Sequence, residues 1–296
     1  MRKTTPEDRG SAEVTSTVHK AVTQDGVELA LERFTGTVKQ RYPVLLTHGT
    51  FSNGQICSRL ARHLAESGFD AWVFELRGHG RSQPPTGAAD FEAFGLYDAP
   101  AAIGAVRAAS GARLLHLIGH SGGGLAFLMH LTRHPEHVAG VASLVTMASQ
   151  ATAACSTVKG QVIVRGAHLL TSVLGYTPGP ALRLGPENEL KGALGAWFRW
   201  NYTRTWTGQD GFDYLSALRL VQVPTLVMAG AGDRVIAPVE GCRKLYQHLA
   251  NRENKFVLGG RSQGFREDYG HARLIASRAA QDEIWPRVTA WLRQYD

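Results

Sequence analysis

The spacing of apolar and polar residues divides the first part of the chain into regular elements. Residues 17–34 alternate between apolar and polar around Asp25-Gly26, which predicts a β-hairpin with a two-residue turn. Two short apolar runs follow, at 42–49 and 70–76, and both are typical of buried strands. Between them, residues 56–68 have helical spacing and end at a glycine. These segments predict a sheet that begins with an antiparallel hairpin and continues with a strand-helix-strand unit.

Strands and helices continue to alternate along most of the chain. The predicted ranges are a helix at 98–111, a strand at 113–120, a helix at 124–134, strands at 138–147 and 223–233, a helix at 241–250, a strand at 254–260 and a helix at 279–295. Strands that are apolar on both faces and alternate with helices are typical of a parallel sheet covered on both sides. The predicted fold class is therefore α/β, with a doubly wound, mostly parallel sheet.

The alternation stops between residues 149 and 222. This segment is rich in Gly, Pro, Trp and Arg, and it has only mixed helical fragments, such as residues 190–202. We expect it to be a cap inserted into the sheet domain. The core is then formed by residues 16–148 and 223–296, and residues 1–15 are expected to be a flexible tail.

Composition places the chain among globular proteins. Its 296 residues, of which 44% are hydrophobic and 19% charged, suffice for one large domain with a substantial core. No apolar stretch reaches the length of a membrane span, and the basic start has no apolar run behind it. We therefore expect no transmembrane segment and a cytoplasmic location. The net charge of +7 comes from scattered arginines, which argues against a nucleic-acid partner and leaves an anionic substrate or an acidic carrier open.

The three cysteines carry no recognisable pattern. Cys57, Cys155 and Cys242 are odd in number and far apart, so they match neither a disulfide framework nor a zinc-binding spacing. We expect them to be buried, inert thiols.

The pattern G-x-S-x-G, which surrounds the nucleophile of many serine hydrolases, occurs twice, at residues 119–123 and 260–264. A nucleophile elbow needs a buried strand, a tight turn with small flanking residues and a following helix. The first match has all three parts, and its central residue is Ser121. The second match is followed by a polar stretch that has no apolar residues at helical spacing, so we expect Ser262 to be a loop residue. Ser121 is the predicted nucleophile.

A serine hydroxyl is a weak nucleophile, so it needs a histidine base and a carboxylate that orients the histidine. In the order Ser, acid, His, the acid is expected at the carboxyl end of a later strand. Asp233 stands directly after the apolar run 224–230 of the predicted strand 223–233, whereas Asp210 and Asp213 precede it and are weaker candidates. His271 follows the last predicted strand in a loop. Ser121, Asp233 and His271 therefore form the predicted catalytic set.

Acyl transfer also needs N–H donors for the oxyanion and a pocket for the acyl group. The first donor is expected to be the backbone N–H of Gly122, where the helix begins. Thr50, in the glycine-rich loop after the strand at 42–49, is expected to supply the second. Phe51, His120 and the cap residue Trp197 are candidates for the substrate pocket, with His120 also a candidate support for the elbow.

Other clusters favour ordinary structural roles. His130, His134 and His137 lie close in sequence, but Pro135 ends the predicted helix before His137 and no pair of carboxylates accompanies them. We therefore expect no metal ion, and no cofactor. The loop at 77–82 lacks the lysine and the spacing of a phosphate-binding loop, and the aromatic stripe at 197–206 fits a lid better than a base-stacking surface.

With these residues placed, the chain resembles the α/β-hydrolases along its whole core. The segments HGTFSNG, FELRGHGRS, GHSGGG, GAGDRVIAP and YGHARLI resemble, in order, the oxyanion, fourth-strand, elbow, acid and histidine motifs of that family. The stretch FEAFGLYDAPAAI before the elbow and the late Trp-Pro helix resemble the acid lipase branch and its bacterial esterase relatives. Two departures are Gly122, where the lipase branch has a bulkier residue, and Arg273, where it has Asp.

This resemblance implies a serine hydrolase that cleaves a small-molecule carboxylic ester through an acyl-enzyme. Relatives with an Asp or Cys nucleophile are disfavoured because residue 121 is Ser. A thioesterase or an acyltransferase with the same triad is the alternative, and a non-catalytic ligand-binding protein on this fold is a third reading. The sequence leaves open the acyl chain, the leaving group, the stereochemistry and the oligomeric state.

Overall fold

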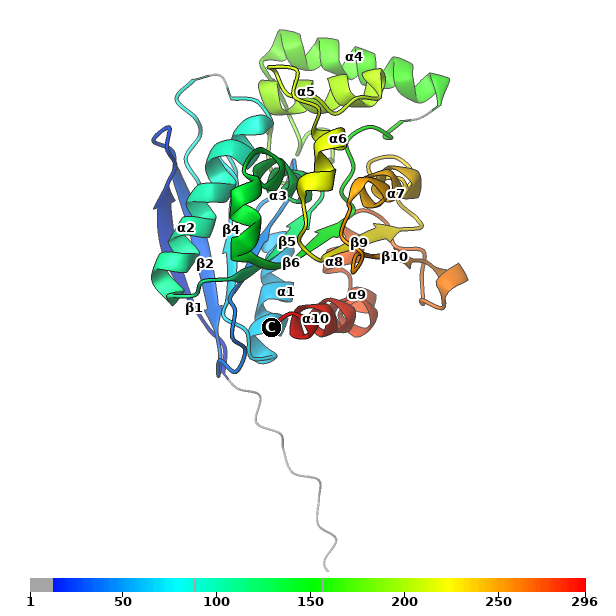
Figure 1. The fold of residues 1–296 in the computed structure, drawn as a ribbon. Helices are drawn as coiled ribbons and strands as arrows, with labels where there is room; N and C mark the ends of the chain where they lie inside the picture. The colour runs from blue at the N-terminus through cyan, green and yellow to red at the C-terminus, as the bar shows by residue number, and fades with distance from the viewer. Residues whose placement is uncertain (1–12, 88, 156) are drawn as a thin grey trace, which may run out of the picture.

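The computed structural model describes residues 13–87, 89–155 and 157–296, and an eight-stranded sheet lies at its centre (Figure 1). The strands lie in the order β1-β2-β4-β3-β5-β6-β9-β10. β1 pairs antiparallel with β2, and β2 pairs antiparallel with β4, whereas all other neighbours are parallel. The strands are β1 (Thr15–Val22), β2 (Glu28–Thr35), β3 (Val44–Thr47), β4 (Ala71–Phe74), β5 (Leu115–His120), β6 (Val141–Met147), β9 (Thr225–Gly230) and β10 (Lys255–Gly259).

Helices cover both faces of this sheet. Figure 1 shows α1, α9 and α10 on one side and α2, α3 and α7 on the other. α1 packs on β2, β3 and β4, α3 packs on β5 and β6, and α7 packs on β9 and β10. The helices are α1 (Gln55–Glu66), η1 (Phe94–Asp98), α2 (Ala99–Ser110), α3 (Gly122–Arg133), η2 (Pro135–Gly140), α7 (Val239–His248), η4 (Arg261–Gln263), α8 (Arg273–Ala276), α9 (Arg278–Glu283) and α10 (Trp285–Gln294). The doubly wound, mostly parallel α/β class predicted from the sequence is confirmed.

The local predictions agree closely with the observed elements of the core. The hairpin turns at Gly26, whose φ of +85° is a conformation that glycine adopts without strain. One predicted helix is wrong, because residues 279–295 form two helices that separate at Ile284. Pro286 lies in the first turn of α10, where its missing amide hydrogen costs nothing, whereas it would break the interior of a longer helix.

The segment between β6 and β9 contains elements of two kinds. α4 (Val158–Leu174) and α5 (Lys191–Thr203) pack on each other and lie above the carboxyl end of the sheet (Figure 1). The short strands β7 (Tyr176–Thr177) and β8 (Glu189–Leu190) pair between them. In contrast, α6 (Tyr214–Ala217) and η3 (Leu218–Leu220) pack against α3 and α7. The division into a core and a cap at 149–222 stays a prediction.

The sequence pattern did not reveal α4. Thr157 caps its first turn by accepting a hydrogen bond from Gly160 N–H at 3.1 Å, and Gly175 ends it in a left-handed conformation. Large apolar side chains of this helix face outward, so its apolar residues do not form a single stripe toward the core.

Among the described residues, no helix combines the length and apolar character that a membrane crossing requires.

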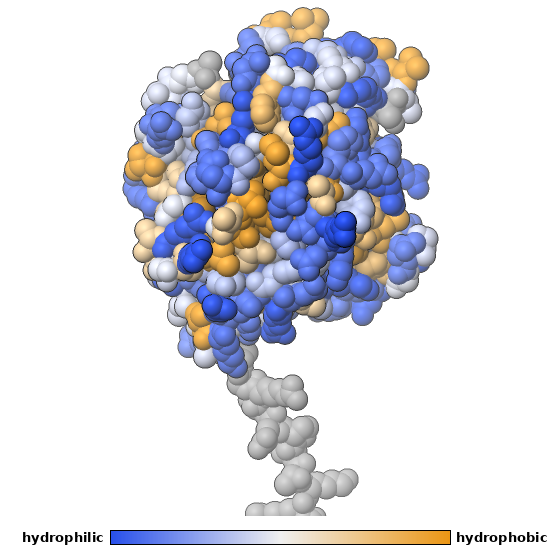
Figure 2. All heavy atoms as spheres, viewed as in Figure 1, coloured by the Kyte–Doolittle hydropathy of each residue, from blue (hydrophilic) through white to orange (hydrophobic). Residues whose placement is uncertain are grey.

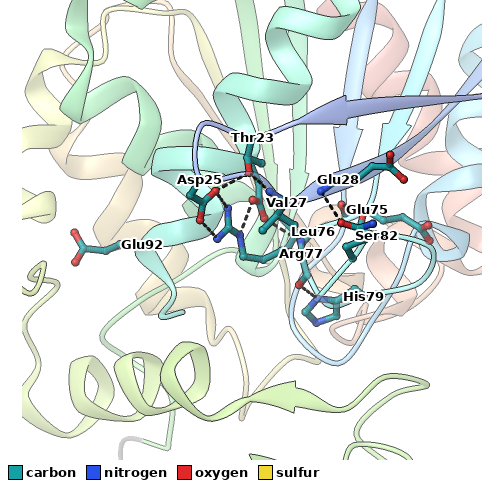
Figure 3. A network of polar contacts seen from close by, with 12 residues as sticks. Thr23, Asp25, Val27, Glu28, Glu75, Leu76, Arg77, His79, Ser82 and Glu92 are labelled. Atoms are coloured by element: carbon teal, nitrogen blue, oxygen red, sulfur yellow. Dashed lines mark hydrogen bonds and ion pairs between the residues drawn. The ribbon is translucent and has the colours of Figure 1, made fainter. Parts of the chain in front are cut away.

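A buried arginine fixes the loop that follows β4. Arg77 is 1% exposed and pairs with Asp98 at 2.7 Å and with Asp25, in the hairpin turn, at 2.6 Å. Figure 3 shows Arg77 reaching Asp25, and the ring of His79 against the Arg77 carbonyl. The hydrogen bond from Arg77 lowers the pKa of Asp25 to about 2. The β1–β2 turn and the loop after β4 are therefore tied together by charge-assisted hydrogen bonds.

The cysteines match their expected inert role only in part. Cys57 and Cys242 are buried, and burial raises the pKa of both thiols, which keeps them protonated. Cys155 is partly exposed, so the expectation that all three are buried is wrong. It lies in the stretch between β6 and α4, where the irregular sequence gave no means of assigning a buried face.

Candidate active site

The turn between β5 and α3 has a backbone that only a glycine-rich sequence can form. Ser121 occupies φ +53° and ψ −121°, a strained conformation for a residue with a side chain. A Cβ added at Gly119 would lie 2.3 Å from the Gly124 nitrogen, and one at Gly123 would lie 2.4 Å from the His48 carbonyl oxygen. These close approaches explain the glycines on both sides of the serine. The strain holds Ser121 out at the end of the strand, as in a nucleophile elbow.

The structure brings the three predicted catalytic residues together from three loops. The His271 Nε2 lies 2.9 Å from Ser121 Oγ, and His271 Nδ1 lies 2.5 Å from Asp233 Oδ2. Ser121 follows β5, Asp233 follows β9, and His271 follows β10. All three strands end at the same edge of the sheet because they run parallel.

Asp233 is held as an ionised carboxylate. Its side chain is 3% exposed, so burial raises its pKa, but the hydrogen bonds that it accepts outweigh burial and the net shift is downward. The first of these comes from His271, and Oδ1 accepts two more from the N–H groups of Ile236 and Ala237, each at 3.1 Å. The carboxylate therefore fixes the imidazole with Nδ1 protonated and Nε2 free to accept the Ser121 proton.

His120 lies behind His271 rather than on an open surface. It is 2% exposed, its Nε2–H donates to the His271 carbonyl at 3.2 Å, and the two ring centroids are 5.0 Å apart. Burial lowers the pKa of His120 to about 3, so its ring is neutral. The structure therefore places His120 as a support for the His271 loop, and its predicted place in the substrate pocket stays untested.

The loop after β3 lies directly against the serine. A Cβ at Gly49 would lie 2.5 Å from Ser121 Cβ, and the position of a Cβ at Gly122 is 3.4 Å from the Thr50 nitrogen. Within residues 13–87, 89–155 and 157–296, neither the Thr50 nor the Gly122 N–H donates to a protein acceptor. Two unpaired N–H donors beside a nucleophile are the arrangement that an oxyanion requires.

Buried His48 orients the Gly49-Thr50 peptide. Its Nε2 accepts a hydrogen bond from Leu76 N–H at 3.1 Å, so Nδ1 carries the proton and donates to the Gly49 carbonyl at 2.8 Å. In a trans peptide the C=O and the next N–H point in opposite directions. A fixed Gly49 carbonyl therefore turns the Thr50 N–H the other way, toward the serine.

Glu189 is a residue of this site that the sequence did not reveal. It lies in β8, its side chain is fully buried, and Oε2 accepts hydrogen bonds from Phe51 N–H at 3.1 Å and from His79 Nε2–H at 3.2 Å. Burial opposes the charge on His79, but the Glu189 carboxylate outweighs it and raises the pKa of His79 to about 9. The segment that contains β8 thus holds the peptide next to Thr50. No motif points to this contact, since 138 residues separate Phe51 from Glu189.

Phe51 and Trp197, the other two predicted pocket residues, are brought together in space. Both pack against one small apolar cluster of α4 and α5. The ring of Phe91, which the sequence analysis did not single out, lies 3.1 Å from where a Cβ of Gly122 would stand. The buried members of the cluster are Val164, Leu194 and Phe198. An apolar, partly aromatic surface therefore extends from the serine toward α4 and α5.

Four polar residues outside the predicted catalytic set are exposed. Ser262 is exposed on η4, and Asp210 pairs with Arg133 at 2.7 Å. Asp213 caps α6 and accepts from Ser216 N–H. Arg273 begins α8 and pairs with Glu267 at 2.7 Å, which fits a surface role.

Comparison with known proteins gives the class of this fold. A family model described as the alpha/beta hydrolase fold matches residues 42–158, which include Thr50 and Ser121. In sequence, the chain is 29% identical over 206 residues to Lipase 3 of Drosophila melanogaster; the match covers 60% of this chain and 50% of that lipase. The chain thus spans about half the length of this curated relative.

Solved structures agree with the family model. A thermophilic esterase from Thermogutta terrifontis has a TM-score of 0.64 at 20% identity, with 94% of this chain and 99% of that chain covered. An esterase from Exiguobacterium antarcticum has a TM-score of 0.67 at 17% identity, with 94% and 100% covered. The chain has the α/β-hydrolase fold, and lipases are among its distant relatives in sequence.

Proposed function

We propose that this protein is a serine hydrolase that cleaves carboxylic esters through an acyl-enzyme. The observation that carries the proposal is the hydrogen-bonded series Ser121, His271, Asp233, with distances of 2.9 and 2.5 Å, beside two backbone N–H groups that have no acceptor in the part of the chain that the structure describes. Similarity to a lipase in sequence and to esterases in fold supports the same class of substrate.

The geometry fits a two-step mechanism. Ser121 Oγ attacks the ester carbonyl while His271 Nε2 takes its proton, and Asp233 stabilises the imidazolium. The Thr50 and Gly122 N–H groups bind the negative oxygen of the tetrahedral intermediate, and each such donor is worth about 3 to 4 kcal/mol. His271 then returns the proton to the leaving alcohol. A water molecule, activated by the same histidine, releases the acid and restores the serine.

The surface above the site supports an ester with an apolar acyl group. α4 has no acidic residue, and Figure 2 shows hydrophobic patches at the top of the molecule, where Figure 1 places this helix. Its exposed large apolar residues are Val158, Val162, Ile163, Leu169, Leu170, Val173 and Leu174. These side chains face solvent, whereas the apolar cluster that Phe51 and Trp197 pack against is the feature that favours a hydrocarbon chain over a polar metabolite.

The proposal is tested with p-nitrophenyl esters of acetate and octanoate and with the matched acyl thioesters. We expect both oxo-esters to be hydrolysed, with kcat/KM at least about tenfold higher for octanoate, since each buried methylene contributes about 0.8 kcal/mol. A thioester preferred over its oxo-ester would favour a thioesterase, and acyl transfer to an added alcohol would favour an acyltransferase. No turnover of any of these substrates would contradict the proposal and favour a ligand-binding role.

A further inference from the structure

The end of α3 that lies far from Ser121 carries a compact group of metal-ligating side chains. His130 stands in the last turn of α3, His134 directly follows the helix, and Glu136 and His137 lie on η2. The ring centroids of the three histidines are 5.1 to 5.4 Å from one another. α3 has 12 residues, so at 1.5 Å per residue this group lies about 18 Å along the helix from the serine.

α3 ends at Arg133, so the helix stops before His137, as Pro135 predicts. The chain then forms the 3₁₀ helix η2, and His137 N–H donates to the His134 carbonyl at 2.9 Å, which keeps the histidines together. The same turn brings in Glu136, so the cluster includes a carboxylate.

Three ligand atoms already lie close to the spacing of a tetrahedral site. His134 Nδ1 is 3.2 Å and His137 Nε2 is 3.9 Å from the same Glu136 Oε1, and all three atoms lie within 4.8 Å of one another. Ligands bound to zinc at about 2.0 to 2.1 Å in a tetrahedron are about 3.3 Å apart. The three side chains are between 41% and 63% exposed, so they are free to close the remaining gap.

His130 is placed to hold His137 in the form that binds a metal. It is 1% exposed, and its Nε2 lies 3.2 Å from His137 Nδ1. When His137 donates its Nδ1–H to this nitrogen, the Nε2 lone pair of His137 faces Glu136. A metal-ligating histidine usually donates its other ring N–H in this way, and the partner fixes the ring orientation.

We propose that His134, Glu136 and His137 form a surface site for a divalent transition-metal ion such as Zn²⁺, with His130 as a positioning residue. Two imidazoles and one carboxylate suit zinc, whereas Mg²⁺ and Ca²⁺ prefer oxygen ligands. The fourth position faces solvent. One carboxylate neutralises half of the ion's charge, and Arg107 lines the same shallow pocket as His130 and His137, so the affinity is expected to be moderate. The bound ion would fasten α3 to the segment that leads into β6.

The test is isothermal titration of the untagged, EDTA-treated full chain with ZnCl₂, and with MgCl₂ as a comparison. We expect one zinc ion per chain, no magnesium binding, and a rise in the melting temperature with zinc. His134→Ala and His137→Ala are expected to weaken binding at least tenfold, a loss typical of altered metal sites. His168→Ala, a control on α4 outside the cluster, should bind zinc as the wild type does.

Two results would overturn the site. One is a dissociation constant for zinc weaker than about 100 µM, which corresponds to about 5.5 kcal/mol of binding free energy. The other is zinc binding that survives both histidine substitutions. Circular dichroism of each variant checks the fold, and Glu136→Gln gives a milder substitution at an exposed position that should also weaken binding.

Discussion

Ser121→Ala is expected to lower kcat for p-nitrophenyl ester hydrolysis by about a millionfold while the protein stays folded, because serine hydrolases lose roughly that factor without their nucleophile. The hydroxyl is the only group on the β5–α3 turn that the His271 Nε2 contacts within hydrogen-bonding distance. Alanine keeps the Cβ and removes only the oxygen, so the turn should hold its shape. Steady-state kinetics and thermal unfolding, measured together, separate loss of chemistry from loss of fold.

The second G-x-S-x-G sequence offers a matched control. Ser262 sits on the exposed helix η4 and has no histidine partner among the described residues. Ser262→Ala should therefore keep wild-type kcat and KM. Retention of more than about 1% of activity in Ser121→Ala would remove this serine from the mechanism.

Asp233→Asn is expected to lower kcat by about 10⁴-fold with little change in fold. The asparagine oxygen can still accept the hydrogen bonds from Ile236 and Ala237, so the loop keeps its shape. Its NH₂ group would then face His271 Nδ1 and would favour the tautomer with the proton on Nε2. A protonated Nε2 cannot accept the Ser121 proton.

The pH dependence of stability gives this substitution a second readout. The pKa of Asp233 is below its ordinary value of 3.8, so the ionised carboxylate stabilises the folded wild type above that pH. This stabilisation is lost as the pH falls through the lowered pKa, and Asp233→Asn should lack that part of the pH dependence of stability.

Asp210→Asn, at the exposed pair with Arg133, is the matched control for activity and should keep wild-type kcat. Equal loss of activity in both variants would contradict the assignment of Asp233.

The core and the triad residues could be predicted because their signals are local. Gly119, Ser121 and Gly123 lie within five residues, so the motif can be read directly from the sequence, although the contact that requires glycine at position 123 is made by His48 in the loop after β3. Asp233 and His271 each follow a strand, and parallel strands place their carboxyl ends at one edge. The positions of Ser121, Asp233 and His271 relative to the predicted strands were therefore enough to predict that the three side chains lie close together.

Features that depend on distant contacts could not be predicted. Glu189 holds the Phe51 peptide across 138 residues, and nothing in its own sequence neighbourhood marks it. α4 was missed because it exposes apolar residues that a soluble helix normally buries, so periodicity gave no clear face. The return of His137 toward His134 depends on the 3₁₀ turn after Pro135, since a proline marks the end of a helix but not the path that follows.

Active-site labelling with a fluorophosphonate probe tests the central claim most directly. Such a probe forms a covalent bond only with a serine activated by a base, and its negative oxygen needs the same N–H donors as an ester intermediate. Intact-mass and peptide analysis should find one probe per chain, attached to Ser121, and none on Ser121→Ala. A wild-type chain that stays unlabelled, or that carries the probe on Ser262, would contradict the proposed hydrolase.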